Sequence, residues 1–92
     1  MPLTQKITLK MRIQKLCRLQ IPTVVRSLYK IEAGEVIKVG INASNLGKGW
    51  QYFYAKIIEE GRFTIPKLAA SQLQREKESL PGKIFEVTLE PP

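Results

Sequence analysis

The stretch Arg18–Pro22 reads RLQIP, and 44 residues further along the chain Arg62–Pro66 reads RFTIP. Each stretch is followed by a short helix-like segment, a glycine and a β-rich run, VIKVGI at 36–41 and IFEVTL at 84–89. A sequence motif that recurs at a fixed spacing, followed by the same series of segments, indicates a duplicated supersecondary unit. A unit of about 35 residues cannot bury a core alone, whereas two such units in one chain can. The sequence therefore predicts a single domain, residues 1–92.

Both halves are expected to follow the order strand, strand, helix, strand, with repeats at 6–41 and 50–90 joined by the turn-rich segment 42–49. Apolar and polar residues alternate at 7–13, which is the period of a half-buried strand. The phase reverses at 15–17, where we expect a bend before the next strand.

Pro22 and Pro66 each suit the first turn of a helix, because the missing N–H has no partner there in any case. Val24, Val25 and Leu28 are the expected apolar face of the first helix. In the second half we expect a long strand at 50–60. The helix after Pro66 is expected to include Leu68, Ala69 and Leu73 in its apolar face and to continue through 75–78.

Charge is distributed unevenly along the chain. Residues 1–31 contain seven Lys or Arg and no Asp or Glu. Residues 32–92 contain eight basic and eight acidic residues, which cancel, so the net charge of +7 resides in the first third. Such asymmetry favours a polyanionic partner, either nucleic acid or an acidic membrane surface, over the alternative of a merely solvated basic face. The chain has no apolar run near 18 residues and no signal-peptide core, so we expect a cytoplasmic protein without a membrane span.

Catalytic and metal-binding residue types are scarce. The sequence contains no histidine and one cysteine, Cys17, which excludes an intramolecular disulfide and a cysteine-based zinc site. No grouping of carboxylates with a nucleophile stands out. We therefore expect a protein that is not an enzyme and that uses no cofactor or metal.

The repeated motif resembles the AbrB/MazE/SpoVT-like swapped-hairpin family of DNA-binding domains, in two tandem copies. The first copy matches the family pattern at Arg18, Ile21, Pro22, Arg26, Leu28, Gly34 and Val39. The second copy matches at Gly61, Arg62, Thr64, Ile65, Pro66, Lys67, Gly82 and Val87. The resemblance implies an α+β, mainly β fold: a pseudo-twofold swapped-hairpin β-barrel built from a duplicated ββαβ unit.

Two departures from the family pattern matter. Cys17 stands where the family has glycine, which raises the expectation of a different turn geometry before Arg18. Ala70 stands where the first copy has Arg26. The two halves are therefore expected to contact DNA unequally.

The resemblance implies that the arginines beside the turn and on the helix approach double-stranded DNA, and guanidinium groups suit both phosphates and guanine edges. Lysines and arginines of the first strand region would add phosphate contacts, which give affinity without sequence information. The alternative is that the arginines pair with Glu32, Glu35 or Glu59 and organise the fold. The predicted DNA-binding residues are Arg18, Arg26, Arg62, Lys10, Arg12, Lys15 and Lys67.

Trp50, Tyr52, Phe53 and Tyr54 form the one aromatic cluster of the sequence. Such side chains can stack on unpaired bases, but they alternate little with basic residues, so we expect them in the core or at the rim of the barrel.

The sequence thus predicts a DNA-binding transcriptional regulator that is cytoplasmic and nucleoid-associated. The alternatives are a DNA-coating chromatin-type protein, an antitoxin-like protein that holds a toxin, and a structural module with an incidental basic strand. A toxin is the weaker choice of partner, because the chain lacks the long acidic tail that such antitoxins carry. A homodimer is compatible with the DNA-binding interpretation.

Overall fold

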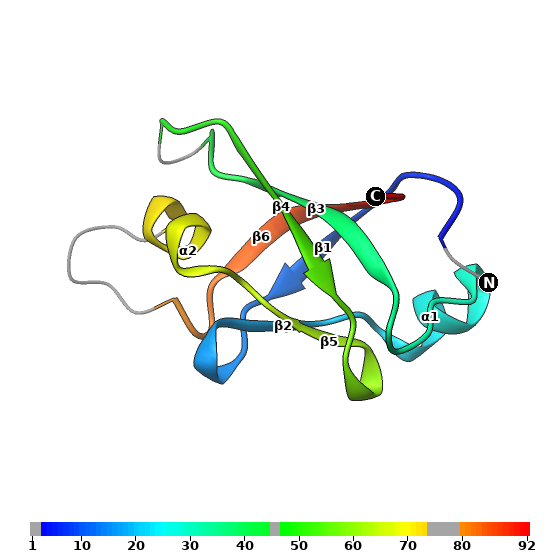
Figure 1. Ribbon diagram of the computed structural model, residues 1–92. Coiled ribbons are helices and arrows are strands. Elements are labelled where there is room, and N and C mark those ends of the chain that lie inside the picture. The colour runs from blue at the N-terminus through cyan, green and yellow to red at the C-terminus, as the bar shows by residue number, and fades with distance from the viewer. Residues whose placement is uncertain (1–2, 45–46, 74–79) are drawn as a thin grey trace.

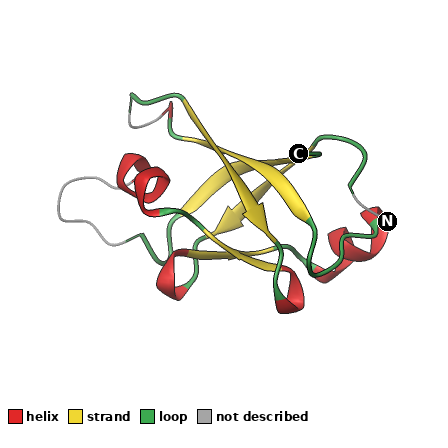
Figure 2. Ribbon diagram, viewed as in Figure 1, coloured by secondary structure: helices red, strands yellow, loops and turns green. Residues whose placement is uncertain are grey.

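The computed structural model describes residues 3–44, 47–73 and 80–92, which form six strands and two α-helices (Figures 1 and 2). Four strands form an antiparallel sheet in the order β1-β6-β3-β4: β1 (Ile7–Arg12), β6 (Ile84–Glu90), β3 (Val36–Asn42) and β4 (Trp50–Lys56). A second antiparallel sheet contains β2 (Arg18–Gln20) and β5 (Arg62–Thr64). The helices α1 (Thr23–Tyr29) and α2 (Lys67–Leu73) lie at opposite ends of the molecule (Figure 1).

The strands form because their apolar residues recur with period two and meet in one core. In β1, Ile7 and Met11 are buried while Lys10 and Arg12 are exposed. The central strands β3 and β6 contribute most of the fully buried side chains of the large sheet, and the small sheet contributes Leu19 and Phe63. A single apolar cluster therefore joins both sheets.

The strand registers repeat at the spacing of the sequence copies. Arg18 lies opposite Thr64 and Gln20 opposite Arg62, and a shift of 44 residues converts one pair into the other. The connecting hydrogen bonds behave in the same way: Ile21 N–H donates to the Gly61 carbonyl, and Ile65 N–H donates to the Cys17 carbonyl, both at 2.9 Å.

The large sheet follows the same rule. Ile7 of β1 lies opposite Leu89 of β6, and Gln51 of β4 lies opposite Ile41 of β3. Gln51 follows Ile7 by 44 residues, and Leu89 follows Ile41 by 48 residues, so the two pairs occupy equivalent positions in the two copies. The β3–β4 pair joins consecutive strands, whereas the β1–β6, β3–β6 and β2–β5 pairs join strands that are distant in sequence.

A short 3-10 turn precedes each strand of the small sheet, namely η1 (Lys15–Cys17) and η3 (Glu59–Gly61). Leu16 and Glu60 adopt left-handed φ angles of 64° and 60°, and Cys17 and Gly61 follow at 52° and 72°. The bend expected at 15–17 is present. The expected difference between the turns is wrong, because Cys17 adopts the left-handed conformation despite its Cβ.

Several sequence expectations need correction. Within the described residues, the strands form two sheets and no closed barrel is seen. The strand expected at 50–60 ends at Lys56, because η3 begins at Glu59. The expected continuation of the second helix through 75–78 lies outside the described residues.

The expected helix faces are only partly correct. Val24 and Leu28 are 76% and 69% exposed, no residue of α1 is fully buried, and Val25 is half-buried. In α2, Ala69 and Leu73 are buried, as expected, whereas Leu68 is 85% exposed. No described helix is long and apolar enough to cross a membrane.

Candidate nucleic-acid interface

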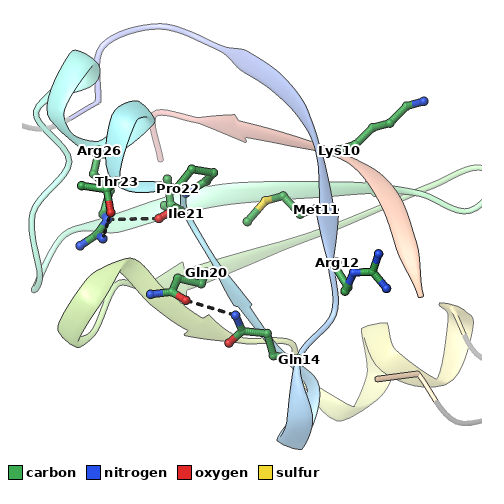
Figure 3. A pocket seen from close by; sticks show the side chains of 9 residues that line it. All are labelled: Lys10, Met11, Arg12, Gln14, Gln20, Ile21, Pro22, Thr23 and Arg26. Carbon is green, nitrogen blue, oxygen red and sulfur yellow. Dashed lines mark hydrogen bonds between the residues drawn. The ribbon is translucent and has the colours of Figure 1, made fainter. Parts of the chain in front are cut away.

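A groove of about 330 Å³ lies between β1 and the junction of β2 with α1 (Figure 3). Three of its lining side chains are cationic and none is acidic, and the lining also includes amide and hydroxyl side chains. We call this the basic groove; it is lined by Lys10, Met11, Arg12, Gln14, Gln20, Ile21, Pro22, Thr23 and Arg26. The groove therefore brings together Lys10, Arg12 and Arg26 from the predicted DNA-binding set.

Arg26 is held in place by its neighbours. Its Nε donates to the Ile21 carbonyl at 3.1 Å, and its Nη2 donates to Thr23 Oγ1 at 3.0 Å. Its aliphatic stem lies against Gly61, where a Cβ would be 2.7 Å from Nε. Within residues 3–44, 47–73 and 80–92, Nη1 has no hydrogen-bond partner. A fixed guanidinium with a spare donor is ready to receive an anion.

Lys10 and Arg12 project from the solvent side of β1 because they alternate with the buried Met11. Figure 3 shows both side chains extending away from Arg26, so the cations border the groove at separate points. Arg12 Nη1 donates to the Gly82 carbonyl at 3.3 Å. Lys10 lies opposite Glu86 in the register, and Glu86 Oε1 accepts a hydrogen bond from Asn42 Nδ2 at 3.0 Å.

The small sheet brings Arg18 and Arg62 to one face. Leu19 and Phe63 are fully buried on its inner side, so alternate residues of β2 and β5 point outward. Arg18 is half-buried, and no described residue forms an ion pair or side-chain hydrogen bond with it. Arg62 is different: its Nη2 pairs with Glu60 Oε2 at 2.9 Å, and its Nε is buried without a hydrogen-bond partner in the described part of the chain.

Amide side chains connect this face to the basic groove. Gln14 Nε2 donates to Gln20 Oε1 at 3.1 Å, and Gln20 Nε2 donates to the Glu60 carbonyl at 3.0 Å. The groove and the outer face of the small sheet therefore form one polar surface. The sequence interpretation missed Gln14, Gln20 and Thr23, although Gln20 lies inside the RLQIP motif and Thr23 directly follows it.

The remaining two predicted residues lie outside the basic groove. Lys15 is exposed in η1, between Gln14 and β2. Lys67 is exposed at the start of α2, at the end of the molecule opposite α1 (Figure 1). Lys10, Arg12 and Arg26 thus line one groove at separate points, Arg18 and Arg62 lie on the adjoining face of the small sheet, and Lys67 lies apart.

The aromatic residues meet the expectation of a core or barrel-rim position only in part. Phe53 is half-buried against the core, whereas Tyr52 and Tyr54 are 51% and 63% exposed. Trp50 stacks on Tyr52 with ring centroids 6.3 Å apart and an interplanar angle of 21°. No group of three or more His, Cys, Asp or Glu side chains that could hold a metal ion occurs among the described residues.

These features define a small α+β fold, mostly of strands, with a basic groove on one half. Neither a family model nor a curated protein matches the sequence. The fold is similar to the solution structure of PHS018 from Pyrococcus horikoshii, with a TM-score of 0.71 and 25% sequence identity. The similarity covers 100% of this chain and 98% of that chain, so it concerns the whole fold.

Proposed function

We propose that this protein binds double-stranded DNA through the basic groove and the adjoining outer face of the small sheet. The observation that carries the proposal is the acid-free lining of the groove by Lys10, Arg12 and Arg26. Arg18 extends the same surface without an ion-pair partner in the described residues. A surface of this kind raises the local concentration of phosphate groups and steers a polyanion to it.

The arrangement favours an extended polyanion over one small anion. Lys10 and Arg12 point away from Arg26, so their charges do not converge on a single point (Figure 3). Phosphates of a duplex follow one another along a backbone and suit cations spread along a groove. Arg26 and Arg18 can additionally contact guanine edges, because a guanidinium fork matches the acceptor pair of that base.

The repeat within the chain bears on the origin of the fold and on which half contacts DNA. The shared 44- and 48-residue spacings of strand pairs support a duplicated ββαβ unit related to the AbrB-like swapped-hairpin domains. The chemistry of the halves differs, since Ala70 stands at the offset position of Arg26. We therefore propose that DNA contacts mainly the first half of the protein. The role that we propose for this binding is transcriptional regulation.

Two alternatives remain as proposals. A DNA-coating protein of the nucleoid would use the same cations but contact phosphates only, without base preference. An antitoxin-like protein would need a surface for a protein partner, and the exposed Val24 and Leu28 of α1 offer an apolar one. A homodimer formed through these residues would double the number of cations that face a duplex.

The test is binding of the whole chain to specific and random duplexes, measured by fluorescence anisotropy at several salt concentrations. If about six phosphates are contacted, the logarithm of the association constant should fall with a slope of roughly −5 against the logarithm of salt concentration. Arg18→Ala and Arg26→Ala should each weaken binding by about 1–3 kcal/mol if they reach bases, and by less if they touch only phosphate.

Lys48→Ala is the matched control, because it removes one charge from an exposed position in the distant β3–β4 connection. Each variant is first checked for folding by circular dichroism. Equal losses for Lys48→Ala and Arg26→Ala would show that only net charge matters and would remove the basic groove as the site. A salt-independent affinity would exclude phosphate contacts altogether.

A further inference from the structure

Alternate residues of β4 project from the outer face of the large sheet, which turns away from the core. The register pairs them with even-numbered residues of β3, whereas the buried side chains of β3 belong to its odd-numbered residues. Tyr52 and Tyr54 are 51% and 63% exposed, so their rings are accessible from solvent. We call the three aromatic residues of this row the aromatic stripe: Trp50, Tyr52 and Tyr54. We propose that the aromatic stripe binds single-stranded DNA by stacking on its bases.

The rings of the aromatic stripe are held in place by their neighbours. Tyr52 packs over Gly40, where an added Cβ would lie 2.6 Å from the Tyr52 Cε1. Trp50 stacks on Tyr52 with an angle of 21° between the ring planes, so the two rings offer bases nearly the same stacking direction. Side chains at alternate positions of a strand lie about 6.8 Å apart. Proteins that bind single strands stack successive bases on such exposed aromatic side chains.

Cations surround the aromatic stripe. The segment 36–58, which contains β3 and β4, has three lysines and no Asp or Glu. Lys48 and Lys56 flank the stripe along the chain, and Lys38 lies beside it on β3, with its Nζ 5.0 Å from the centroid of the Tyr52 ring. Stacking of a base on a ring is stronger than an exposed cation–π contact. A base can therefore take the place of this ammonium group, which then pairs with the adjoining phosphate.

In the described part of the chain, the acidic side chains of the outer face belong to β6, on the far side of β3 from β4. Glu86 Oε1 accepts a hydrogen bond from Asn42 Nδ2 at 3.0 Å, and Glu90 lies opposite Lys38 in the register. Carboxylates repel phosphates. The DNA strand should therefore follow β4 and keep away from β6.

Other polyanions and partners fit the aromatic stripe less well. The bases of a duplex are already stacked and paired, so they cannot lie on the rings. A second copy of this chain, which also carries a net charge of +7, would bring like charges together. An acidic membrane surface would attract the lysines, but a ring that packs over Gly40 cannot insert among acyl chains.

The polar groups next to the rings favour DNA over RNA. Asn42 Nδ2 donates to Glu86, and Asn42 Oδ1 accepts from the Ser44 N–H at 2.9 Å. Thr88 Oγ1 is buried. Neither side chain is free to bind a 2′-hydroxyl, the group that distinguishes RNA from DNA.

The test is binding of the whole chain to fluorescein-labelled oligodeoxyuridine of about ten nucleotides, measured by fluorescence anisotropy. Saturable binding should also change the fluorescence of Trp50, the only tryptophan of the chain. An oligomer of the same length that lacks bases keeps the phosphates and should bind about tenfold more weakly or worse. Oligouridine differs only in the 2′-hydroxyl and should bind no more tightly than oligodeoxyuridine.

Variants at two positions separate stacking from charge. Tyr54→Ala should weaken binding about fivefold to 100-fold, whereas Tyr54→Phe should stay within about threefold, because it keeps the ring. Since Tyr54 is mostly exposed, both variants should fold, which circular dichroism checks. Lys38→Gln should reduce the log–log salt slope by about 0.7. Lys15→Gln is its control, because Lys15 is an exposed residue of η1, outside the large sheet.

The proposal is overturned if the oligomer without bases binds as well as oligodeoxyuridine, or if Tyr54→Ala leaves the affinity unchanged. Tighter binding of oligouridine, or of vesicles of phosphatidylserine and phosphatidylcholine, would also overturn it, as would a homodimer that Tyr54→Ala dissociates.

Duplex binding is tested separately, because the aromatic stripe and the basic groove contain different residues. Arg26→Ala should weaken duplex binding and leave single-strand binding unchanged, and Tyr54→Ala should do the reverse. Equal losses of single-strand binding in both variants would place the strand in the basic groove and remove the stripe as its site.

Discussion

Arg26 packs over Gly61, a residue from the other half of the chain, and the close fit leaves no room for a side chain at residue 61. The same arginine donates to the Ile21 carbonyl and to Thr23 Oγ1. One side chain thus connects α1 to the turn before β5 and also borders the basic groove. Stability and the proposed DNA contact are therefore coupled at this position.

Replacement of Gly61 by alanine should destabilise the protein and displace Arg26. Gly47→Ala is the control, because Gly47 has nearly the same φ, 73° against 72°, and nothing within 4 Å of an added Cβ. Both variants incur backbone strain of about 1–2 kcal/mol. Gly61→Ala should cost about 1–3 kcal/mol more through steric overlap. Urea unfolding measures the difference, and equal costs would contradict the packing described.

Two substitutions should build a second site like that of Arg26 and Gly61 at the equivalent positions of the repeat. Cys17 and Ala70 stand, at the offset of 44 residues, where Gly61 and Arg26 stand. Ala70→Arg alone should destabilise the fold, because the Cys17 side chain fills the space that Gly61 leaves open. The double variant Cys17→Gly/Ala70→Arg should fold stably and make the salt slope of duplex binding steeper by about 0.9. An unchanged slope in a well-folded double variant would argue against phosphate contact at this position.

Gly40→Ala should destabilise the protein by about 1–3 kcal/mol, because the new methyl group would overlap Tyr52 and Thr88. Part of this cost should disappear in a Tyr52→Ala background, where the ring no longer covers residue 40 but the Thr88 hydroxyl still overlaps the methyl group. The coupling between the two substitutions is expected to lie at about 0.5–3 kcal/mol. A double-mutant cycle by thermal or urea unfolding measures it, and strict additivity would place the ring elsewhere.

The exposed apolar residues of α1 should matter for association and little for folding. Val24→Ser and Leu28→Ser should each change the free energy of unfolding by less than about 0.5 kcal/mol, since both side chains are mostly exposed. Leu73→Ala in α2 should cost about 2–5 kcal/mol, because Leu73 is 2% exposed. If α1 mediates a homodimer, sedimentation should show dissociation of the Val24→Ser/Leu28→Ser variant. A large loss of stability would mean that α1 packs more closely than described.

Local structure was predicted well where it depends only on the alternation of apolar and polar residues or on the backbone chemistry of proline. Alternation at 7–13 gave β1, and the prolines at 22 and 66 marked the starts of both helices. The bend at 15–17 followed from the reversal of phase. The offset of 44 residues seen in the sequence recurs in the structure, where the Ile21 to Gly61 hydrogen bond corresponds to the Ile65 to Cys17 hydrogen bond.

Burial and side-chain partners were harder to predict, because they depend on what lies across from each residue. Val24 and Leu28 have the spacing of an apolar helix face, yet no described element covers them. Arg62 pairs with Glu60, two residues away, and not with Glu59, one of the carboxylates considered for the arginines from sequence alone. The groove itself arises from the meeting of β1 with the β2–α1 junction, which no single segment encodes.

The arrangement of β1 beside β6 has a consequence for the order of the chain. Ile7 lies opposite Leu89, so residues near the two ends of the chain are neighbours in the same sheet, and this pair corresponds to Gln51 and Ile41 on the other side. The segment between Asn42 and Trp50 joins the corresponding pair of strands. A circular permutant that links the present termini with a connection of similar length and opens the chain between Asn42 and Trp50 should therefore reach the same fold. Its sequence would simply begin with the other half.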